Sequence, residues 1–283
     1  MGKSETALEV ARVFNCEIIN GDAFQVYKEM NIGVAKPPKD YFDIVPHHLF
    51  SFVEINQDYS IADYQKDLRY AISEIVSRGK NVVIVGGSGL YIRSGLYDYT
   101  FEEQQSIDMS KYDKLTNEEL HKELEKIDPK QAEVIHMNNR KRVLRAIEIY
   151  LGNGKTKTEI IDSQEHKLVY DSKFFVRDMD REKLYSLIDQ RVDKMMAEGL
   201  LDEVKAIYSK YGESSKALQA IGYKELIPVI KGECSLERGV ELVKKNSRNY
   251  AKRQVTFIKH QFPVVFYKNT NDLLEILKKW VII

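Results

Sequence analysis

The sequence predicts an α/β fold in which a parallel sheet is flanked by helices and interrupted by an all-helical insertion. Short apolar runs at residues 17–19 and 82–85 are each followed by a polar or glycine turn, as at the ends of buried strands. Between residues 99 and 171 strand-like runs vanish and helix signals dominate. We therefore expect an α/β core formed by residues 1–98 and 172–283, with residues 99–171 as a helical insertion domain.

Composition and charge restrict the classes of protein to which the chain can belong. Its 283 residues suffice for a sizeable core, and 43% hydrophobic and 30% charged residues are typical of a soluble globular protein. We expect a cytoplasmic protein without a membrane partner, because the sequence has two cysteines, no spanning apolar run and no signal-peptide pattern. Since the formal net charge is +0, any nucleic-acid site must be a local basic patch.

The first predicted helix, over residues 5–14, directly follows Gly2, Lys3 and Ser4. Gly-Lys-Ser at the start of a helix is the second half of a phosphate-binding P-loop, in which backbone N–H groups and the lysine hold phosphates and the hydroxyl binds Mg²⁺. The strand and the first glycine that would precede it are not in this sequence, and we expect a truncated or misassigned start. Three residues are a weak signal by themselves.

The stretch from residue 18 to 36 follows the first predicted strand. Asn20 and Gly21 break the apolar run, so Asp22 falls at the carboxyl end of the strand, where ligands bind in open α/β sheets. This carboxylate, which is followed by Gln25 and Tyr27, is placed to meet a substrate. The alternative is that Asp22 only caps the following turn, and this stretch alone favours that interpretation.

The second strand–turn–helix unit is preceded by a histidine pair and a helix. His47 and His48 lack a third metal ligand of matching type nearby, so a structural role is favoured. Ser60 and Asp63 form a capping box that begins a helix. Gly-Gly-Ser-Gly at residues 86–89 then follows the second strand, and its N–H groups could face an anion or simply join strand to helix.

The predicted insertion carries basic residues on one helix. A capping box at Thr116 and a proline at residue 129 begin its first two helices, and a third covers about residues 140–151. The face opposite its apolar stripe holds Lys141, Arg142 and Arg145. A solvated charged face is the default interpretation, and contact with a phosphate backbone is the sharper one.

Two further helices follow the insertion. In the helix that begins near Arg181, Arg191 lies at the edge of the apolar stripe and needs an anionic partner, either a structural carboxylate or a ligand phosphate. The last long helix covers about residues 236–261, and no acidic residue occurs between Glu241 and Asp272. Its basic stripe, which indicates a polyanion and most plausibly nucleic acid, comprises Lys245, Arg248, Lys252 and Lys259.

Nearly the whole chain resembles the bacterial tRNA dimethylallyltransferases, which prenylate an adenosine beside the anticodon. The resemblance implies a P-loop NTPase-like fold with a helical insertion, Mg²⁺ as cofactor, and the tRNA anticodon stem-loop and dimethylallyl diphosphate as partners of a monomer. The matching segments are GKS from Gly2, GDAFQVYKEMNIGVAK from Gly21, VPHHL from Val45, YSIADYQ from Tyr59, VGGSGLY from Val85, NNRKRVLRAIEIY from Asn138, QRVDKMMAEGLLDEV from Gln190, AIGYKEL from Ala220 and AKRQVTFIK from Ala251.

The resemblance also implies a role for each candidate residue. Asp22 would accept a proton from the exocyclic adenine amine, with Arg191 and Ser88 as the other catalytic residues. The expected diphosphate-binding residues are Gly2, Lys3 and Ser4, the last also binding Mg²⁺. The target base must be flipped into the site, where Gln25 would read it. The residues expected to bind tRNA are Asp22, Ala23, Phe24, Gln25, Lys141, Arg142, Arg145, Arg248, Lys252 and Arg253.

The sequence departs from the family pattern at a few positions. Ser88 replaces a threonine but keeps the hydroxyl, and Leu187 stands where many relatives have arginine, one helical turn before Arg191.

Three other classes of protein remain as alternatives. A P-loop small-molecule kinase would not need two basic surfaces, nor would an isopentenyltransferase acting on free adenine nucleotides. The third alternative is a catalytically impaired tRNA-binding relative.

Overall fold

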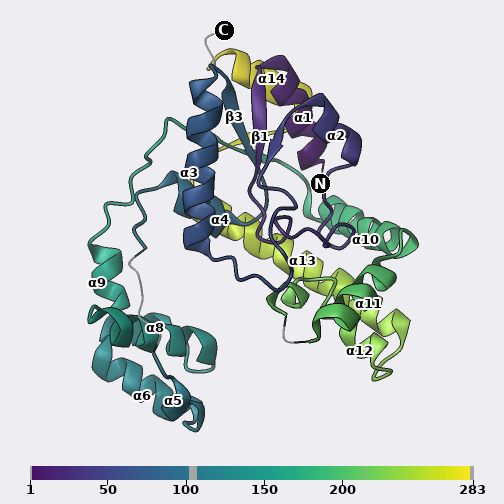
Figure 1. Cartoon of the computed structure of the whole chain (residues 1–283). Coiled ribbons are helices and arrows are strands. Elements are labelled where there is room, and N and C mark those ends of the chain that lie inside the picture. Colours follow the sequence, from purple (N-terminus) through teal and green to yellow (C-terminus); the bar gives the residue numbers. More distant parts are fainter. Residues whose placement is uncertain (1, 102–106, 214, 281–283) are drawn as a thin grey trace. The chain divides into compact units, whose positions relative to one another are not determined.

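The computed structural model describes residues 2–101, 107–213 and 215–280, which divide into two compact units (Figure 1). The first unit comprises the described residues up to 96 and from 170 onward, and the second comprises those between 97 and 169. The first unit contains parallel strands, as the sequence predicts, and the second is built from helices. Each unit has a hydrophobic core of its own.

The sheet of the first unit is parallel and has the strand order β2-β1-β3. Its strands are β1 (Cys16–Asn20), β2 (His47–His48) and β3 (Asn81–Val85). The central position of β1 explains why the strand is buried along its whole length. The register pairs Ile18 with Val83 on one side and with His47 on the other. Both strands predicted from apolar runs are therefore confirmed.

Helices α1 (Lys3–Val13) and α3 (Ile61–Ser77) pack against β1 and β3 (Figure 1). The predicted capping box of α3 is present, with Ser60 and Asp63 satisfying each other's backbone N–H groups. Because α1 runs back into the start of β1, its first residues lie at the carboxyl edge of the sheet. The structure begins α1 two residues earlier than expected, which places Lys3 and Ser4 in its first turn.

The remainder of the first unit carries a two-stranded parallel sheet and a set of helices. The last long helix has the bounds that the sequence predicts. These elements are α2 (Lys39–Ile44), α4 (Gly89–Leu96), β4 (Phe174–Arg177), α10 (Arg181–Ala197), α11 (Leu200–Tyr211), a 3₁₀ helix (Lys216–Gln219), α12 (Ile227–Ile230), α13 (Leu236–Gln261), β5 (Val264–Tyr267) and α14 (Thr270–Lys278).

The second unit is a small helical body. Its core is formed chiefly by α6 and α8, where Leu120, Leu124, Val143 and Ile147 are fully buried. The expected capping box at Thr116 begins α6. The helices of this unit are α5 (Ser110–Asp113), α6 (Asn117–Ile127), α7 (Pro129–Val134), α8 (Arg140–Asn153) and α9 (Lys157–Asp162). Within the described ranges of the chain, no helix has both the length and the hydrophobicity needed to cross a bilayer.

The histidine pair has the structural role favoured from sequence. His48 on β2 bonds through Nε2 to Glu17 Oε2 at 2.7 Å, and the His47 ring bonds to the Val45 carbonyl at 2.7 Å. Glu17 is buried in β1 and also pairs with Arg78 and Lys80. A carboxylate inside the sheet is therefore neutralised by cationic groups around it.

Candidate active site

Two loops at the carboxyl edge of the sheet are in backbone contact. A Cβ atom at Gly86 would lie 2.0 Å from the carbonyl of Gly21, so that only glycine permits this approach. The Gly21 N–H donates to Val85 O at 2.8 Å, and the Ser88 N–H donates to Gly21 O at 3.1 Å. These bonds bring Ser88, which follows β3, next to Asp22, which follows β1.

The backbone of Asp22 is held by a buried asparagine that sequence reasoning did not single out. Asn20 Oδ1 accepts from the Asp22 N–H at 2.8 Å, and Asn20 Nδ2 donates to the Asp22 carbonyl at 2.9 Å. Asp22 Oδ1 in turn accepts from the Phe24 N–H at 3.1 Å. The capping interpretation is thus correct for one carboxylate oxygen. Oδ2 takes no part in that bond.

Two cations interact with the charge of Asp22. Lys3 as a whole residue is exposed, whereas its charged end is surrounded by protein: Nζ lies 3.3 Å from where a Cβ of Gly87 would be. Burial lowers the pKa of Lys3, and Asp22 opposes this effect. Burial likewise lowers the pKa of Arg191, again opposed by Asp22. In the part of the chain that the structure describes, Arg191 Nε is buried without a hydrogen-bond partner.

Ser88 and the glycine turn are also contacted by α13. Ser88 Oγ accepts from the Ala23 N–H at 2.9 Å, which ties the turn to the Asp22 loop. Gln254 Nε2 donates to Gly87 O at 2.7 Å. Tyr250 lies near Ser88 and Gln254, whose side chains act to lower its pKa against the larger rise caused by burial. The sequence places Tyr250 on the side of α13 opposite its basic stripe but gives no sign that this side meets the predicted site.

Gln25 is held by the loop that follows it. Its Nε2 donates to Val34 O at 2.9 Å and to Ala35 O at 3.2 Å, which occupies both amide hydrogens. If Gln25 reads the target base as expected, it can do so only through Oε1, which remains to accept a hydrogen bond.

The same loop is anchored by Glu203 on α11. Its carboxylate accepts from the backbone N–H groups of Asn31, Ile32 and Gly33 at 3.0, 2.9 and 3.0 Å. Tyr223 donates its hydroxyl proton to the same carboxylate at 2.6 Å. The polypeptide following Asp22 is therefore fixed by hydrogen bonds to its main chain rather than left as an open loop.

The predicted tRNA-binding residues of α13 differ in their surroundings. Arg248 pairs with Asp189 of α10 at 2.5 Å and is partly buried, so α10 holds it. Lys252 and Arg253 are exposed. The Arg253 guanidinium lies 5.7 Å from the centroid of the Tyr250 ring. Within the predicted stripe, Lys245 and Lys259 are exposed as well.

In the second unit, α8 exposes Lys141, Arg142 and Arg145 on one side, as predicted. Arg145 pairs with Glu148 at 2.7 Å. Lys157 lies near Arg142: its pKa is lowered mainly by burial and further by the Arg142 charge. Sequence reasoning missed Lys157, because the contact joins two helices of the unit.

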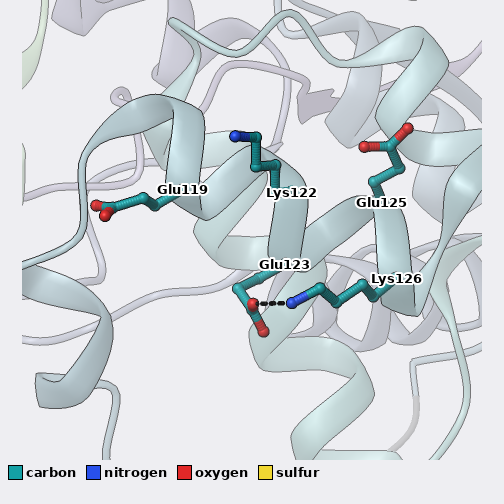
Figure 2. A pocket seen from close by; sticks show the side chains of 5 residues that line it. All are labelled: Glu119, Lys122, Glu123, Glu125 and Lys126. Atoms are coloured by element: carbon teal, nitrogen blue, oxygen red, sulfur yellow. Dashed lines mark hydrogen bonds and ion pairs between the residues drawn. The ribbon is translucent and has the colours of Figure 1, made fainter.

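A hollow on α6 is lined by charged residues of both signs and contains no predicted site residue (Figure 2). Lys126 Nζ lies 2.6 Å from Glu123 Oε1. This is the pattern of a solvated, salt-bridged helix face. Its lining residues are Glu119, Lys122, Glu123, Glu125 and Lys126.

No group of three histidine, cysteine, aspartate or glutamate side chains suited to a metal ion occurs among the described residues. Ser4 lies in the first turn of α1, next to Lys3. A single hydroxyl is a poor site by itself, but Mg²⁺ is often bound by one or two protein oxygens together with phosphate oxygens and waters. The donor set therefore fits a Mg²⁺ ion that is bound together with a phosphorylated ligand.

Comparison with known proteins identifies close relatives. The family model described as IPP transferase matches residues 25–261. A tRNA dimethylallyltransferase from Anoxybacillus flavithermus is 44% identical over 97% of this chain and 89% of its own length. The enzyme of the same name from Bacillus velezensis is 46% identical over 93% of this chain and 86% of its own length.

Solved structures agree with the sequence relatives. The tRNA delta(2)-isopentenylpyrophosphate transferase of Staphylococcus epidermidis is 40% identical, with a TM-score of 0.73 over 99% of this chain and 94% of its own. A eukaryotic dimethylallyltransferase acting on tRNA is 28% identical, with a TM-score of 0.82 over 98% of this chain and 74% of its own. The similarity extends over both sequence and fold.

Proposed function

Because the chain belongs to the IPP transferase family, whose curated relatives are tRNA dimethylallyltransferases, we propose a residue-level mechanism for its reaction. The reaction transfers a dimethylallyl group to the exocyclic amine of the tRNA adenosine next to the anticodon. A carbon–nitrogen bond forms at the allylic carbon, the carbon–oxygen bond to diphosphate breaks, and the amine loses one proton. The observation that supports the mechanism is the convergence of Asp22, Ser88, Lys3 and Arg191 at one edge of the sheet.

Asp22 is the proposed proton acceptor. An exocyclic adenine amine is a poor nucleophile, because its lone pair is delocalised into the ring. The hydrogen bond from the Phe24 N–H fixes Oδ1, and the hydrogen bonds of Asn20 fix the backbone of Asp22. Oδ2 is the oxygen that would face the amine. General-base assistance of this kind contributes ~10²–10⁴-fold to the rate.

The first turn of α1 is the proposed diphosphate site, of the P-loop type. The helix N-terminus directs N–H groups toward an anion, and Gly2, Lys3 and Ser4 lie there. Arg191 Nε supplies a further donor to the charge that develops on the leaving oxygen, and the hydroxyl of Ser88 lies nearby. Mg²⁺, held in part by Ser4, would supply additional positive charge beside the diphosphate.

The tRNA is proposed to bind along exposed basic residues, with the target base flipped out of the stacked loop. Ala23, Phe24 and Gln25 are proposed to line the pocket for the base beside Asp22. Lys252 and Arg253 on α13 would contact phosphates, as would Lys141, Arg142 and Arg145 in the second unit. Arg248 is proposed to contribute indirectly, by holding α13 on α10 through Asp189.

The test is prenyl transfer to an unmodified anticodon stem-loop that carries A-A-A. The chain is incubated with dimethylallyl diphosphate and Mg²⁺, and mass spectrometry measures the addition of one dimethylallyl group. We expect Asp22→Ala to lower kcat by ~10²-fold or more while the stem-loop still binds. The matched control is Asp40→Asn, an exposed carboxylate on α2.

Two outcomes would contradict the proposal at different levels. A wild-type rate in Asp22→Ala would exclude Asp22 as the base but leave the reaction assigned. Binding of the stem-loop without any product from the unmodified chain would indicate an RNA-binding relative that lacks catalysis.

A further inference from the structure

Asn20, the last residue of β1, is the centre of a hydrogen-bond network at the carboxyl edge of the sheet. Its side chain is 0% exposed. Oδ1 accepts from the Asp22 N–H at 2.8 Å, and Nδ2 donates to the Asp22 carbonyl at 2.9 Å and to the Leu49 carbonyl at 3.0 Å. Both amide hydrogens are therefore in use, and these partners, two carbonyls and one N–H, admit only one orientation of the amide.

The two bonds to Asp22 determine the direction of its side chain. A residue has only two soft backbone dihedrals, so holding both its N–H and its carbonyl fixes the direction of its Cα–Cβ bond. The Phe24 N–H then fixes the rotation of the carboxylate by donating to Asp22 Oδ1 at 3.1 Å. The position of Oδ2 therefore depends on the amide of Asn20, which is itself fully buried and out of reach of a substrate.

The third hydrogen bond of Asn20 reaches the segment that follows β2. Leu49 and Ser51 in this segment have φ values of +62° and +53°, in the left-handed region that L side chains rarely adopt. The Ser51 N–H donates to the Gln25 carbonyl at 3.1 Å. Because such backbone conformations persist only where the surroundings hold them, the bond to the Leu49 carbonyl helps to hold this segment against the residues that follow Asp22.

Asn20 is itself held by two other elements. The Tyr64 hydroxyl, on α3, donates to the backbone carbonyl of Asn20 at 2.8 Å in a buried hydrogen bond. On β3, Val85 is the partner of Asn20 in the sheet register. The side-chain amide therefore extends from a fixed backbone, so that its hydrogen bonds hold Asp22 in a fixed place relative to the sheet.

We propose that Asn20 is a positioning residue for the prenyl transfer: its side-chain amide orients Asp22 toward the target amine and couples Asp22 to the segment of residues 49–53. The inference rests on the proposed function, because it takes Asp22 as the proton acceptor. Loss of the amide should therefore slow the reaction through Asp22, and a residue that only supported the fold would not show this dependence.

The experiment removes the amide and measures steady-state kinetics. Asn20→Ala should lower kcat about tenfold, with the KM values for stem-loop and dimethylallyl diphosphate changed less than about twofold. Asn20→Ser should lower kcat only about threefold, because a hydroxyl can accept from the N–H two residues further on and donate to one carbonyl. The matched control is Asn81→Ala, which should have the kcat of wild type. It removes an amide that donates to the Phe14 carbonyl at 3.0 Å, at the amino end of β3.

The double variant separates positioning of Asp22 from general support of the fold. In the Asp22→Ala background, Asn20→Ala should change kcat less than about twofold, because the carboxylate that it orients is gone. If Asn20→Ala does not fold, Asn20→Ser in both backgrounds gives the same comparison. Multiplying effects, or a wild-type kcat in Asn20→Ala while Asp22→Ala is impaired, would overturn this inference alone. A wild-type kcat in Asp22→Ala would overturn the inference together with the role proposed for Asp22.

Discussion

At the residue scale, Asp22 shows how one side chain combines a structural contact with a proposed chemical one. The Phe24 N–H engages Oδ1, and Asn20 holds the N–H and the carbonyl of the same residue. A residue whose backbone is held at two points and whose carboxylate is held at one loses little further freedom when a substrate binds, and such preorganisation favours reaction at the remaining oxygen. Capping and catalysis are therefore not competing interpretations here.

Arg191 offers a direct test of the diphosphate site. Arg191→Met keeps the length and the apolar contacts of the side chain but removes its charge and its N–H groups. We expect kcat to fall ~10²-fold and the KM for dimethylallyl diphosphate to rise, while the KM for stem-loop is unchanged, as measured by steady-state kinetics. Lys194→Met, an exposed change on the same helix, is the control. An unaltered kcat would show that Arg191 only balances the charge of Asp22.

Glu17 predicts a pH dependence of stability. Burial acts to raise its pKa, but hydrogen bonds from His48, Arg78 and Lys80 outweigh burial and lower the pKa to about 2. A lowered pKa means that the native state holds the charged form more strongly than the unfolded chain does. The resulting stabilisation is fully present above the unfolded pKa of about 4.5 and is lost as the pH falls toward 2.

The measurement is urea unfolding of wild type and Glu17→Gln between pH 7 and pH 3. We expect the variant to be less stable at pH 7 by at most about 3 kcal/mol, since Arg78 and Lys80 remain partly in contact with water. The difference should shrink on acidification, whereas Glu9→Gln, on the exposed face of α1, should show none. A difference that is constant with pH would mean that packing, not charge, makes Glu17 important.

At the scale of elements, the sequence predicts local structure well because the signals are local. The bounds of α13 and the capping boxes at Ser60 and Thr116 depend on residues within a few positions of each other. Which side of α13 faces the predicted site is not set by such local signals. It depends on the close approach of Gly89 to Phe257, which forms only once β3 lies beside β1. Tyr250 was missed for this reason.

The basic residues of α13 also differ in whether a tertiary contact holds them: Arg248 is paired, and Lys252 is exposed. Lys252→Ala should weaken stem-loop binding and make it less sensitive to salt, with no loss of stability. Arg248→Ala should instead cost about 1 kcal/mol of stability, because Asp189 loses its partner in a half-buried contact. Binding titrations and urea unfolding of both variants separate the two effects. Equal losses of affinity without loss of stability would return Arg248 to the tRNA-contact set.

At the scale of the whole molecule, the charge is balanced overall but uneven locally. Formal net charge is +0, so long-range attraction does not bring a polyanion to the chain as a whole. Exposed basic residues gather on α13 in the first unit and on α8 in the second. The sequence could predict that the 99–171 stretch is helical, because its periodicity is visible. It could not predict which cations the folded chain would neutralise.

The second unit supports a prediction about charge placement rather than charge number. Removing two exposed cations from α8, in Lys141→Ala/Arg142→Ala, should raise the Kd for stem-loop about tenfold and make the slope of log K against log salt less steep by about 1.4–1.8. The kcat at saturating stem-loop should be unchanged, because the chemistry is proposed to lie in the first unit.

The control variant Lys122→Ala/Lys126→Ala removes the same charge from the same unit, on the α6 face shown in Figure 2. Lys126 there already pairs with Glu123, so this control should leave the Kd within about twofold of wild type. Equal effects of the two double variants would mean that net charge, and not a defined α8 surface, attracts the RNA.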